Sequence, residues 1–309
     1  MKNKYHNIEN DLKVIGSNYL MNESMRKHTT FGIGGLVDIL ILPKDNSQIP
    51  GIINSINTHN IQFYFLGSGS NILVTDKGIR GAIISLKKSS KKIIFKESTV
   101  FVECGVMLGT LVKQLNHRNI TGFESLMGVP GTVGGALMMN AGAFGAEISN
   151  NLLSVNTIDQ KGNMKEYSVG DINFSYRDSN FPANEILINA IFKCKRGNKN
   201  IIDDKKNSAS KLRKKNQPLK YRSAGSIFKN PHDVAAGYLI DQAGLKGIRI
   251  GDAEISTKHA NFIINLGNAK SSDVIELIKI IKNKVYTLYN IKLELEIKII
   301  GELTNEIYE

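Results

Sequence analysis

The chain has 309 residues, 41% of them hydrophobic and 22% charged, which is the balance of a globular protein large enough for two or three domains. Its net charge of +12 comes mainly from lysine, 32 residues against eight arginines, so it predicts a solvated surface that attracts polyanionic small molecules rather than a nucleic-acid site. Two distant cysteines, a start without a secretory signal and the lack of a run of about 18 apolar residues argue against a disulfide framework and a membrane span, and we expect a cytoplasmic protein.

The first part of the chain combines short apolar strands with two glycine clusters. A weakly amphipathic segment at 10–27 precedes the sequence HTTFGIGG at 28–35, and GSGSN at 67–71 separates two apolar runs. A strand, a glycine-rich turn and a second strand are typical of nucleotide-binding units. However, neither G-x-G-x-x-G nor Gly-Lys-Ser/Thr occurs in the chain, which argues against a Rossmann dinucleotide fold and a Walker A loop. We predict strands at 37–42, 61–66 and 72–75 and a helix at 47–57.

The middle of the chain holds the segment GVPGTVGGALMMNAGAFG at 128–145, in which six glycines are interleaved with apolar residues. Glycine is used where φ is positive or where the main chain approaches another group closely, and N–H groups in such a segment can cradle anionic oxygens. A tight structural turn is the alternative, but six glycines around Pro130, Thr132 and Asn140 favour a bound nucleotide or cofactor. Nearby we predict strand-like alternation at 91–104, a helix at 108–118 and strands at 152–158, 163–169 and 186–195.

The composition changes at 196–220, a polar stretch rich in lysine that predicts a domain boundary. Beyond it, a helix at 233–243 is expected to end at Gly244, since glycine is favoured just after a helix. Asp273 and the acidic residue three positions later resemble a capping box before an amphipathic helix. We also predict strands at 261–265 and at 291–299, where apolar and charged residues alternate strictly.

Three polar residues could carry chemistry, and each also has a structural explanation. Ser226, in the motif SAGSIFKNP, can be a turn residue or cap, and the nucleophile elbow G-x-S-x-G is absent. Arg177 can form a salt bridge with Asp178 or another carboxylate instead of stabilising an oxyanion. Glu296 shares one face of the predicted last strand with Glu294, so periodicity cannot choose between them, and a solvated charge is the default for both.

Seven motifs follow one another along the chain: FGIGG at 31–35, GSGSN at 67–71, GVPGTVGGALMMNAGAFG at 128–145, YRDS at 176–179, SAGSIFKNP at 223–231, KHANFIIN at 258–265 and LELEIKIIG at 293–301. Together they resemble the UDP-N-acetylenolpyruvoylglucosamine reductases (UDP-N-acetylmuramate dehydrogenases), flavoenzymes that complete UDP-N-acetylmuramate for bacterial peptidoglycan. The resemblance covers nearly the whole chain. It is to the shorter subgroup, because there is no room before Arg177 for the loop that covers the substrate in longer relatives.

The resemblance implies an α+β fold with a vanillyl-alcohol-oxidase-type FAD-binding domain at 1–200, made of two α+β subdomains at about 1–87 and 88–200, and a C-terminal α/β substrate-binding domain at 201–309. It implies that NADPH reduces the bound FAD and leaves, and that the UDP-sugar then enters the same site. We expect a monomer without metal or nucleic acid. The residues implied to bind FAD are Thr30, Gly32, Gly34, Gly67, Ser68, Gly69, Ser70, Asn71, Gly128, Pro130, Gly131, Thr132, Gly134, Gly135, Asn140, Gly142 and Ala143, and those implied to bind substrate are Tyr176, Arg222, Lys229 and Asn230.

The same resemblance implies a role for each of the three polar residues. Hydride adds to the terminal carbon of the enolpyruvyl group, and the negative charge that develops is stabilised by Arg177 and by a protonated Glu296 whose pKa is raised by burial. Ser226 then protonates the neighbouring carbanionic carbon. A side chain introduced at Gly131 or Gly134 is expected to clash with the cofactor.

Two other functions are compatible with parts of the sequence. A flavin-dependent oxidase or dehydrogenase with an unrelated substrate would keep the glycine clusters, but it has no reason to keep Ser226, Arg177 and Glu296 in their present contexts. A basic RNA-binding protein would carry arginine-rich and aromatic surface motifs, which the sequence lacks. A yellow colour of the purified protein would exclude the RNA-binding function.

Overall fold

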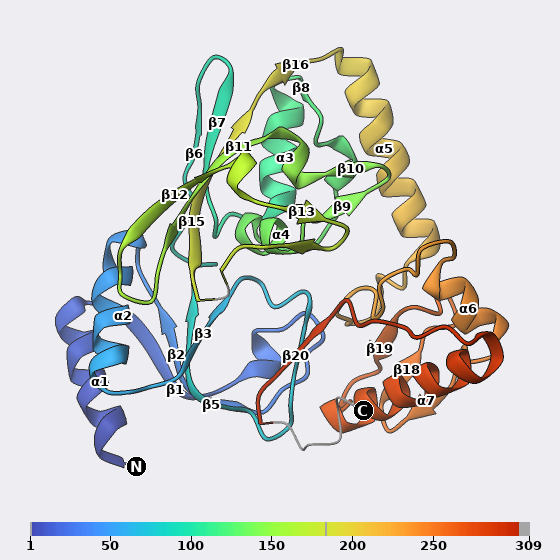
Figure 1. Cartoon of the computed structure of the whole chain (residues 1–309), viewed down its shortest axis with the longest axis horizontal. Coiled ribbons are helices and arrows are strands. Elements are labelled where there is room, and N and C mark those ends of the chain that lie inside the picture. Colours follow the sequence, from blue (N-terminus) through green and yellow to red (C-terminus); the bar gives the residue numbers. More distant parts are fainter. Residues whose placement is uncertain (1, 183, 303–309) are drawn as a thin grey trace. The chain divides into compact units, whose positions relative to one another are not determined.

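The computed structural model describes residues 2–182 and 184–302, so that residues 303–309 of the predicted C-terminal domain lie outside the described part (Figure 1). The chain forms two compact units. Unit 1 comprises Met1–Met21, Ile39–Ser68 and Gly81–Lys211, and unit 2 comprises Asn22–Asp38, Gly69–Arg80 and Leu212–Glu309.

These units differ from the contiguous domains predicted from the sequence. The predicted boundary after residue 200 falls inside the helix α5 (Lys199–Asn216). In addition, 22–38 and 69–80 belong to the same unit as the C-terminal part. The physical reason is a shared apolar core, since Phe31 and Leu73 are buried in one cluster with the side chains of the C-terminal helices.

The first core of unit 1 is formed by two helices and a sheet, three of whose strands (18–24, 36–42 and 79–85) have some of their residues in unit 2. A four-stranded sheet has the order β1-β2-β5-β3, and β3 and β5 are parallel. The helix α2 carries Pro50 in its first turn, where the missing N–H costs nothing. Ile8 and Leu12 pack with the isoleucines of α2 and of the sheet. The bounds are α1 (Lys2–Ile15), β1 (Asn18–Ser24), β2 (Leu36–Leu42), α2 (Ile49–Thr58), β3 (Phe63–Leu66) and β5 (Ile79–Ser85).

The second core of unit 1 lies against a five-stranded antiparallel sheet with the order β12-β11-β15-β7-β6. The helix α3 buries Leu108, Leu111, Val112 and Leu115 as predicted. Figure 1 shows α3 and the short helix α4 beside this sheet. The bounds are β6 (Ile93–Phe95), β7 (Thr99–Glu103), α3 (Leu108–His117), β8 (Ile120–Thr121), α4 (Val133–Met138), β9 (Gly142–Ala143), β10 (Ala146–Glu147), β11 (Leu152–Ile158), β12 (Met164–Ser168), β13 (Phe174–Ser175), β14 (Asp178–Ser179), β15 (Ile186–Lys193) and β16 (Lys195–Arg196).

Unit 2 has one core, which the amphipathic helix α7 shares with a three-stranded sheet of order β17-β18-β19. The strand β20 pairs in parallel with β4. Gly244 follows α6 with φ of 72°, which confirms the predicted helix end. The bounds are β4 (Ile72–Val74), α6 (Ala236–Gln242), β17 (Arg249–Ile250), β18 (Ala253–Ile255), β19 (Ile263–Asn265), α7 (Ser271–Tyr289) and β20 (Lys298–Ile300).

Two predictions for unit 2 are wrong in detail. The predicted strand at 291–299 is regular only at its end, in β20. Before β20, the pairing within the described residues is an isolated bridge between Leu295 and Phe228. The alternation arises instead from an extended segment that buries Leu293 and Ile297. The predicted capping box is also placed three residues too far along the chain. The N-cap of α7 is Lys270, and Asp273 is the third residue of the helix, where it accepts a hydrogen bond from Lys270 N–H at 2.9 Å.

Helices and strands are thus mixed within both units, which confirms the predicted α+β class. Within the described part of the chain, none of the helices combines the length and the apolar character that a bilayer crossing requires.

Candidate active site

Ser226 lies on an extended segment of unit 2 that pairs with chain on both sides. On one side it forms a β-bridge with Phe262, and Ile227 N–H donates a hydrogen bond to Asn261 O at 2.9 Å. On the other side, Glu296 N–H donates to Ile227 O at 2.8 Å. Two of the three predicted catalytic residues, Ser226 and Glu296, are therefore on neighbouring segments that are joined through the main chain of Ile227.

A buried asparagine that the sequence-based prediction missed holds this segment in place. Asn261, 3% exposed, accepts a hydrogen bond from Phe228 N–H at 2.9 Å and donates from Nδ2 to Phe228 O at 2.8 Å. Its carboxamide satisfies both main-chain groups of Phe228, as a neighbouring strand would. The available signal was an amide within the apolar sequence HANFII, since a buried asparagine must find internal partners.

His259 lies beside this asparagine. Its Nδ1 accepts a hydrogen bond from Asn261 N–H at 3.3 Å, and its ring packs on Phe262 with a centroid distance of 4.8 Å. Burial, followed by the positive charge of Lys246, lowers the pKa of His259. The imidazole is therefore neutral at neutral pH and carries its proton on Nε2.

The structure distinguishes the two glutamates that periodicity could not. The side chain of Glu294 is 79% exposed, and its Oε2 lies 3.9 Å from Lys229 Nζ, which is a loose surface pair. Glu296 is half-buried. Asn71 Nδ2 donates to Glu296 O at 2.9 Å, and Lys298 N–H donates to Asn71 O at 2.9 Å. Asn71, predicted to bind FAD, thus anchors the segment that carries Glu296.

The glycine cluster at 28–35 is tied to two other predicted site loops of unit 2. Thr30 N–H donates to Gly69 O at 3.0 Å, and Thr30 Oγ1 donates to Ser223 O at 2.8 Å. Asn265, 4% exposed, donates from Nδ2 to Phe31 O at 3.0 Å. Thr30, Gly69 and the loop leading to Ser226 are therefore brought together, and a second buried asparagine of the KHANFIIN motif holds the cluster.

Arg222, a predicted substrate residue, is exposed and its side chain packs on Gly32. A Cβ atom at Gly32, where φ is 68°, would lie 2.5 Å from Arg222 Nη1. Gly32 therefore makes room for the guanidinium, in addition to its positive φ. Gly34 and Gly69 are also crowded by the protein, by Val74 and by the main chain of His28 respectively.

The glycine-rich segment at 128–145 in unit 1 turns into α4, and Thr132 is the N-cap of that helix. Gly135 N–H donates to Thr132 Oγ1 at 3.2 Å, and Gly134 N–H donates to Cys104 O at 2.9 Å. These two N–H groups are already used within the protein. Contacts of Gly134 and Gly135 with a cofactor stay predictions.

The glycines of this segment differ in what surrounds them. A Cβ atom at Gly134 would lie 3.0 Å from Cys104 Cβ and 3.3 Å from Cys104 O, so a larger residue there disturbs packing before it can meet a ligand. A Cβ atom at Gly135 would meet only Thr132 Oγ1 at 3.5 Å, and one at Gly145 would meet nothing within 4 Å. Phe144 between them is 55% exposed. Gly135 and Gly145 are thus less crowded by the protein than Gly134 is.

Gly128 and Gly131 have φ of 79° and 135°, conformations that favour glycine. Gly67 lets Thr132 approach, since a Cβ atom there would lie 2.5 Å from Thr132 Oγ1. The contacts of these residues and of Ser68, Ser70, Pro130 and Ala143 with FAD stay predictions.

Arg177 lies at the tip of a hairpin in unit 1. The strands β13 and β14 pair Ser175 with Asp178, so that Tyr176 and Arg177 form a two-residue loop. Arg177 has φ of 58°, which is uncommon for a residue with a side chain. Its guanidinium carbon lies 5.0 Å from the centre of the Tyr176 ring. Its Nη1 lies 3.4 Å from the position of a Cβ atom on Gly142, which places it beside the glycine-rich segment.

Arg177 thus belongs to unit 1, whereas Ser226 and Glu296 belong to unit 2. Among the other predicted substrate residues, Tyr176 is 46% exposed. Asn230 Oδ1 accepts a hydrogen bond from Ala236 N–H at 3.1 Å, and so this side chain pairs the first N–H group of α6. Substrate contacts of Tyr176, Arg222, Lys229 and Asn230 stay predictions.

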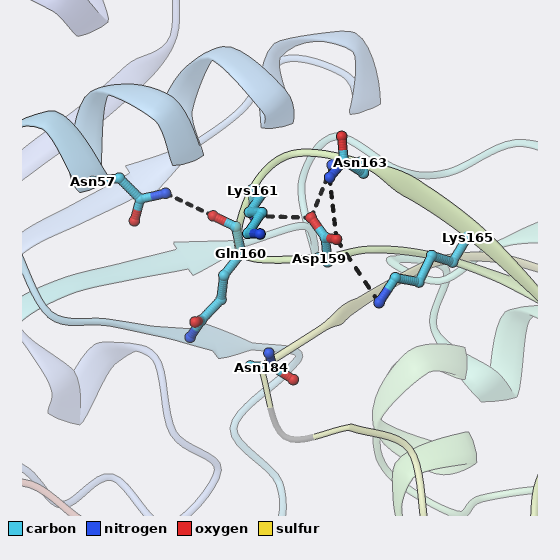
Figure 2. A pocket seen from close by; sticks show the side chains of 7 residues that line it. All are labelled: Asn57, Asp159, Gln160, Lys161, Asn163, Lys165 and Asn184. Carbon is cyan, nitrogen blue, oxygen red and sulfur yellow. Dashed lines mark hydrogen bonds and ion pairs between the residues drawn. The ribbon is translucent and has the colours of Figure 1, made fainter.

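A polar pocket of about 510 Å³ lies elsewhere in unit 1, beside the turn between β11 and β12 (Figure 2). Asp159 accepts hydrogen bonds there from Lys161 N–H at 2.8 Å and from Asn163 N–H at 2.9 Å. These bonds fix the turn. The lining contains none of the predicted site residues, so we do not place the chemistry there; it consists of Asn57, Asp159, Gln160, Lys161, Asn163, Lys165 and Asn184.

Comparisons with known proteins identify the family of the chain. Residues 37–168 match the model of an FAD binding domain, and residues 217–300 match that of the UDP-N-acetylenolpyruvoylglucosamine reductase C-terminal domain. UDP-N-acetylenolpyruvoylglucosamine reductases of Clostridium tetani and Carboxydothermus hydrogenoformans are 39% and 41% identical, over 96% and 94% of this chain and 96% of each relative.

A similar structure is the crystal structure of the reductase of the same name from Thermus caldophilus. Its TM-score is 0.79 at 32% identity, and the match covers 92% of this chain and 98% of that one. The likeness therefore extends over both compact units. By sequence and by fold, the chain belongs to the UDP-N-acetylenolpyruvoylglucosamine reductase family.

Proposed function

We propose that this protein uses bound FAD to reduce the enolpyruvyl group of UDP-N-acetylenolpyruvoylglucosamine, giving UDP-N-acetylmuramate for peptidoglycan, with NADPH as the hydride donor. The observation that carries the proposal is the pairing of the Ser226 and Glu296 segments through Ile227, in a chain of this family. We infer a monomer that acts in the cytoplasm and supports cell-wall biogenesis, cell shape and cell division.

FAD, when bound, supplies the redox chemistry: it accepts a hydride from NADPH and passes one to the terminal carbon of the enolpyruvyl group. The chain supplies charge stabilisation and a proton. Arg177 provides a fixed positive charge for the carboxylate and the developing negative charge. Glu296, protonated, donates a hydrogen bond to the same charge.

Ser226 supplies the proton that completes the reduction. Its hydroxyl proton goes to the carbon next to the carboxylate, and the serine oxygen regains a proton from solvent. One hydride and one proton are thus added across the carbon–carbon double bond. A serine hydroxyl is a weak acid, but the carbanionic carbon is basic enough to take its proton.

The three loops at 30–34, 67–71 and 128–145 are proposed to hold FAD. We propose that 37–168 is the main part of the FAD-binding region and that 217–300 binds the UDP-sugar. NADPH and the UDP-sugar would use one site in turn.

Anaerobic mixing tests this function directly. Flavin absorbance should fall when NADPH is added to the yellow protein, and it should return when the enolpyruvyl UDP-sugar is added in the absence of oxygen. A protein that purifies without flavin, or a reduced flavin that the UDP-sugar does not reoxidise, would contradict the proposal. Reoxidation by another acceptor alone would favour the flavin-dependent oxidase or dehydrogenase.

A further inference from the structure

Asn140, within the glycine-rich segment at 128–145, is a buried polar residue with an uncommon backbone conformation. It is fully buried, and its φ is 39°. Its Nδ2 donates to Glu147 Oε2 at 2.7 Å and to Ser175 O at 3.0 Å. Both partners only accept hydrogen bonds, so the orientation of the carboxamide is fixed. Its Oδ1 is buried without a partner among the described residues, and the fold tolerates this cost to keep the two donor bonds.

These bonds anchor the hairpin that carries Arg177. Ser175 is the last residue of β13, two positions before Arg177. On the other strand, Ser179 Oγ donates to Met138 O at 2.8 Å. Both strands of the hairpin are therefore fixed to the chain at 138–140. Since Arg177 has a positive φ, its turn needs such external anchors to persist.

Glu147 connects the anchor to the arginine side chain. It pairs with Gly142 in the ladder between β9 and β10. The position of a Cβ atom on Gly142 lies 3.0 Å from Glu147 Cγ and 3.4 Å from Arg177 Nη1. The two side chains thus flank the same glycine, and a larger residue at 142 would push against both.

We propose that Glu147 is a positioning residue for Arg177: it holds Asn140, which holds the hairpin, and it lies beside the guanidinium across Gly142. The proposal rests on the role proposed above for Arg177 in the reduction of the UDP-sugar. Glu147 touches neither substrate nor cofactor in this role. Its loss should therefore slow only the step that uses Arg177.

A double-mutant cycle tests the proposal. Glu147→Ala, Arg177→Ala and the double variant are prepared as flavin-loaded protein, reduced with NADPH without oxygen, and mixed rapidly with the enolpyruvyl UDP-sugar. Glu147→Ala should slow flavin reoxidation about tenfold in the wild-type background but less than about twofold in the Arg177→Ala background. Reduction by NADPH should stay as in the wild type for Glu147→Ala.

Conservative and control variants distinguish a role of Glu147 in positioning Arg177 from a general effect on folding. Glu147→Gln keeps an acceptor for Asn140 Nδ2 and should restore most of the reoxidation rate. Glu147→Asp shortens the side chain by one methylene group and should reoxidise its flavin more slowly than the wild type. This variant replaces Glu147→Ala in the experiment if the alanine variant does not fold. Glu166→Ala, on the exposed side of β12, should match the wild type.

The outcomes are distinct. Equal slowing by Glu147→Ala in both backgrounds, or slowing of reduction and reoxidation alike, would overturn the positioning role while leaving the role of Arg177 intact. A wild-type rate for Glu147→Asp and Glu147→Ala would do the same. A wild-type reoxidation rate for Arg177→Ala alone would overturn both the proposed role of Arg177 and this inference.

Discussion

Ser226 and Arg177 are proposed to act on the same small group of atoms, but the two units hold them differently. Ser226 lies on an extended segment with hydrogen-bonded chain on both sides, supported by the carboxamide of Asn261. Arg177 lies at the tip of a two-residue hairpin in a positive-φ conformation. The first arrangement depends on many main-chain bonds, whereas the second depends on a few side-chain anchors.

The comparison predicts different sensitivities in the two units. Main-chain pairing tolerates changes in side chains, so in unit 2 only the buried amides and the reacting groups themselves should be sensitive. A positive φ costs about 1 to 2 kcal/mol for a residue with a Cβ atom, so in unit 1 the anchors of the hairpin should matter more.

Ser226→Ala should have the largest effect, because it removes the proton donor and leaves the paired main chain intact. Reoxidation of the reduced flavin by the UDP-sugar should slow by about 10² to 10⁴, as for the loss of a general acid. Reduction by NADPH should be unchanged. Ser223→Ala on the same segment is the control. Rapid reoxidation by the Ser226 variant would make this residue part of a structural loop only.

Glu296 should show the next largest effect. Glu296→Gln keeps a hydrogen-bond donor, so turnover should decrease in the order wild type, Gln, Ala, with a loss of about 10² for Ala. Substrate affinity should change much less, since the interaction develops in the transition state. Glu294→Ala is the matched control, because that side chain is 79% exposed. Similar small losses at both positions would identify Glu296 as a surface charge.

The two buried asparagines of unit 2 provide a matched pair. Asn261→Ala leaves both main-chain groups of Phe228 unpaired, which should lower the free energy of unfolding by about 1 to 3 kcal/mol and slow reoxidation about tenfold. Asn265→Ala should cost similar stability but weaken flavin binding instead, because it holds Phe31. Thermal unfolding, flavin titration and single-turnover reoxidation distinguish them. Identical kinetic defects in both variants would mean that the asparagines support only the fold.

Gly134 and Gly135 separate packing from cofactor contact in unit 1. Gly134→Ala should destabilise the protein without flavin, since its Cβ meets Cys104 at 3.0 Å. In the flavin-free protein, Gly135→Ala should leave the free energy of unfolding unchanged or raise it by up to about 1 kcal/mol, because alanine favours a helix. The same substitution should weaken flavin binding. Fluorescence titration with FAD and thermal unfolding measure both. Undiminished flavin affinity in Gly135→Ala would remove this residue from the cofactor contact.

The smallest effect should come from His259. Its pKa is lowered in the fold, so the unfolded chain takes up a proton first as pH falls below about 6.5. The stability that depends on the neutral ring is present above that pH and is lost below it. His259→Gln should therefore lose less thermal stability than the wild type between about pH 7.5 and pH 5.5. An equal loss in the two proteins would show that His259 does not control this dependence.

Much of the fold follows from local sequence patterns. The helices at 108–117 and 236–242 and the strand at 152–158 were predicted closely, because the spacing of apolar residues and the glycine after a helix act locally. The seven motifs and their order also sufficed to indicate the family. These features depend on residues that are near one another in the chain.

The contacts between segments that are distant in the sequence could be seen only in the tertiary structure. Asn261 bonds to Phe228 and Asn71 bonds to Glu296, and in each pair the two residues are far apart in the sequence. Packing in the folded chain leaves Glu294 exposed and Glu296 half-buried, although the two lie on the same predicted face. The strict alternation at 291–299 predicted one regular strand, but among the described residues the pairing is limited to the bridge at Leu295, with the hydrogen bonds of Glu294 and Glu296 on either side, and to β20. Strand pairing and burial require a second segment that packs alongside. A local sequence pattern does not reveal which distant segment that is.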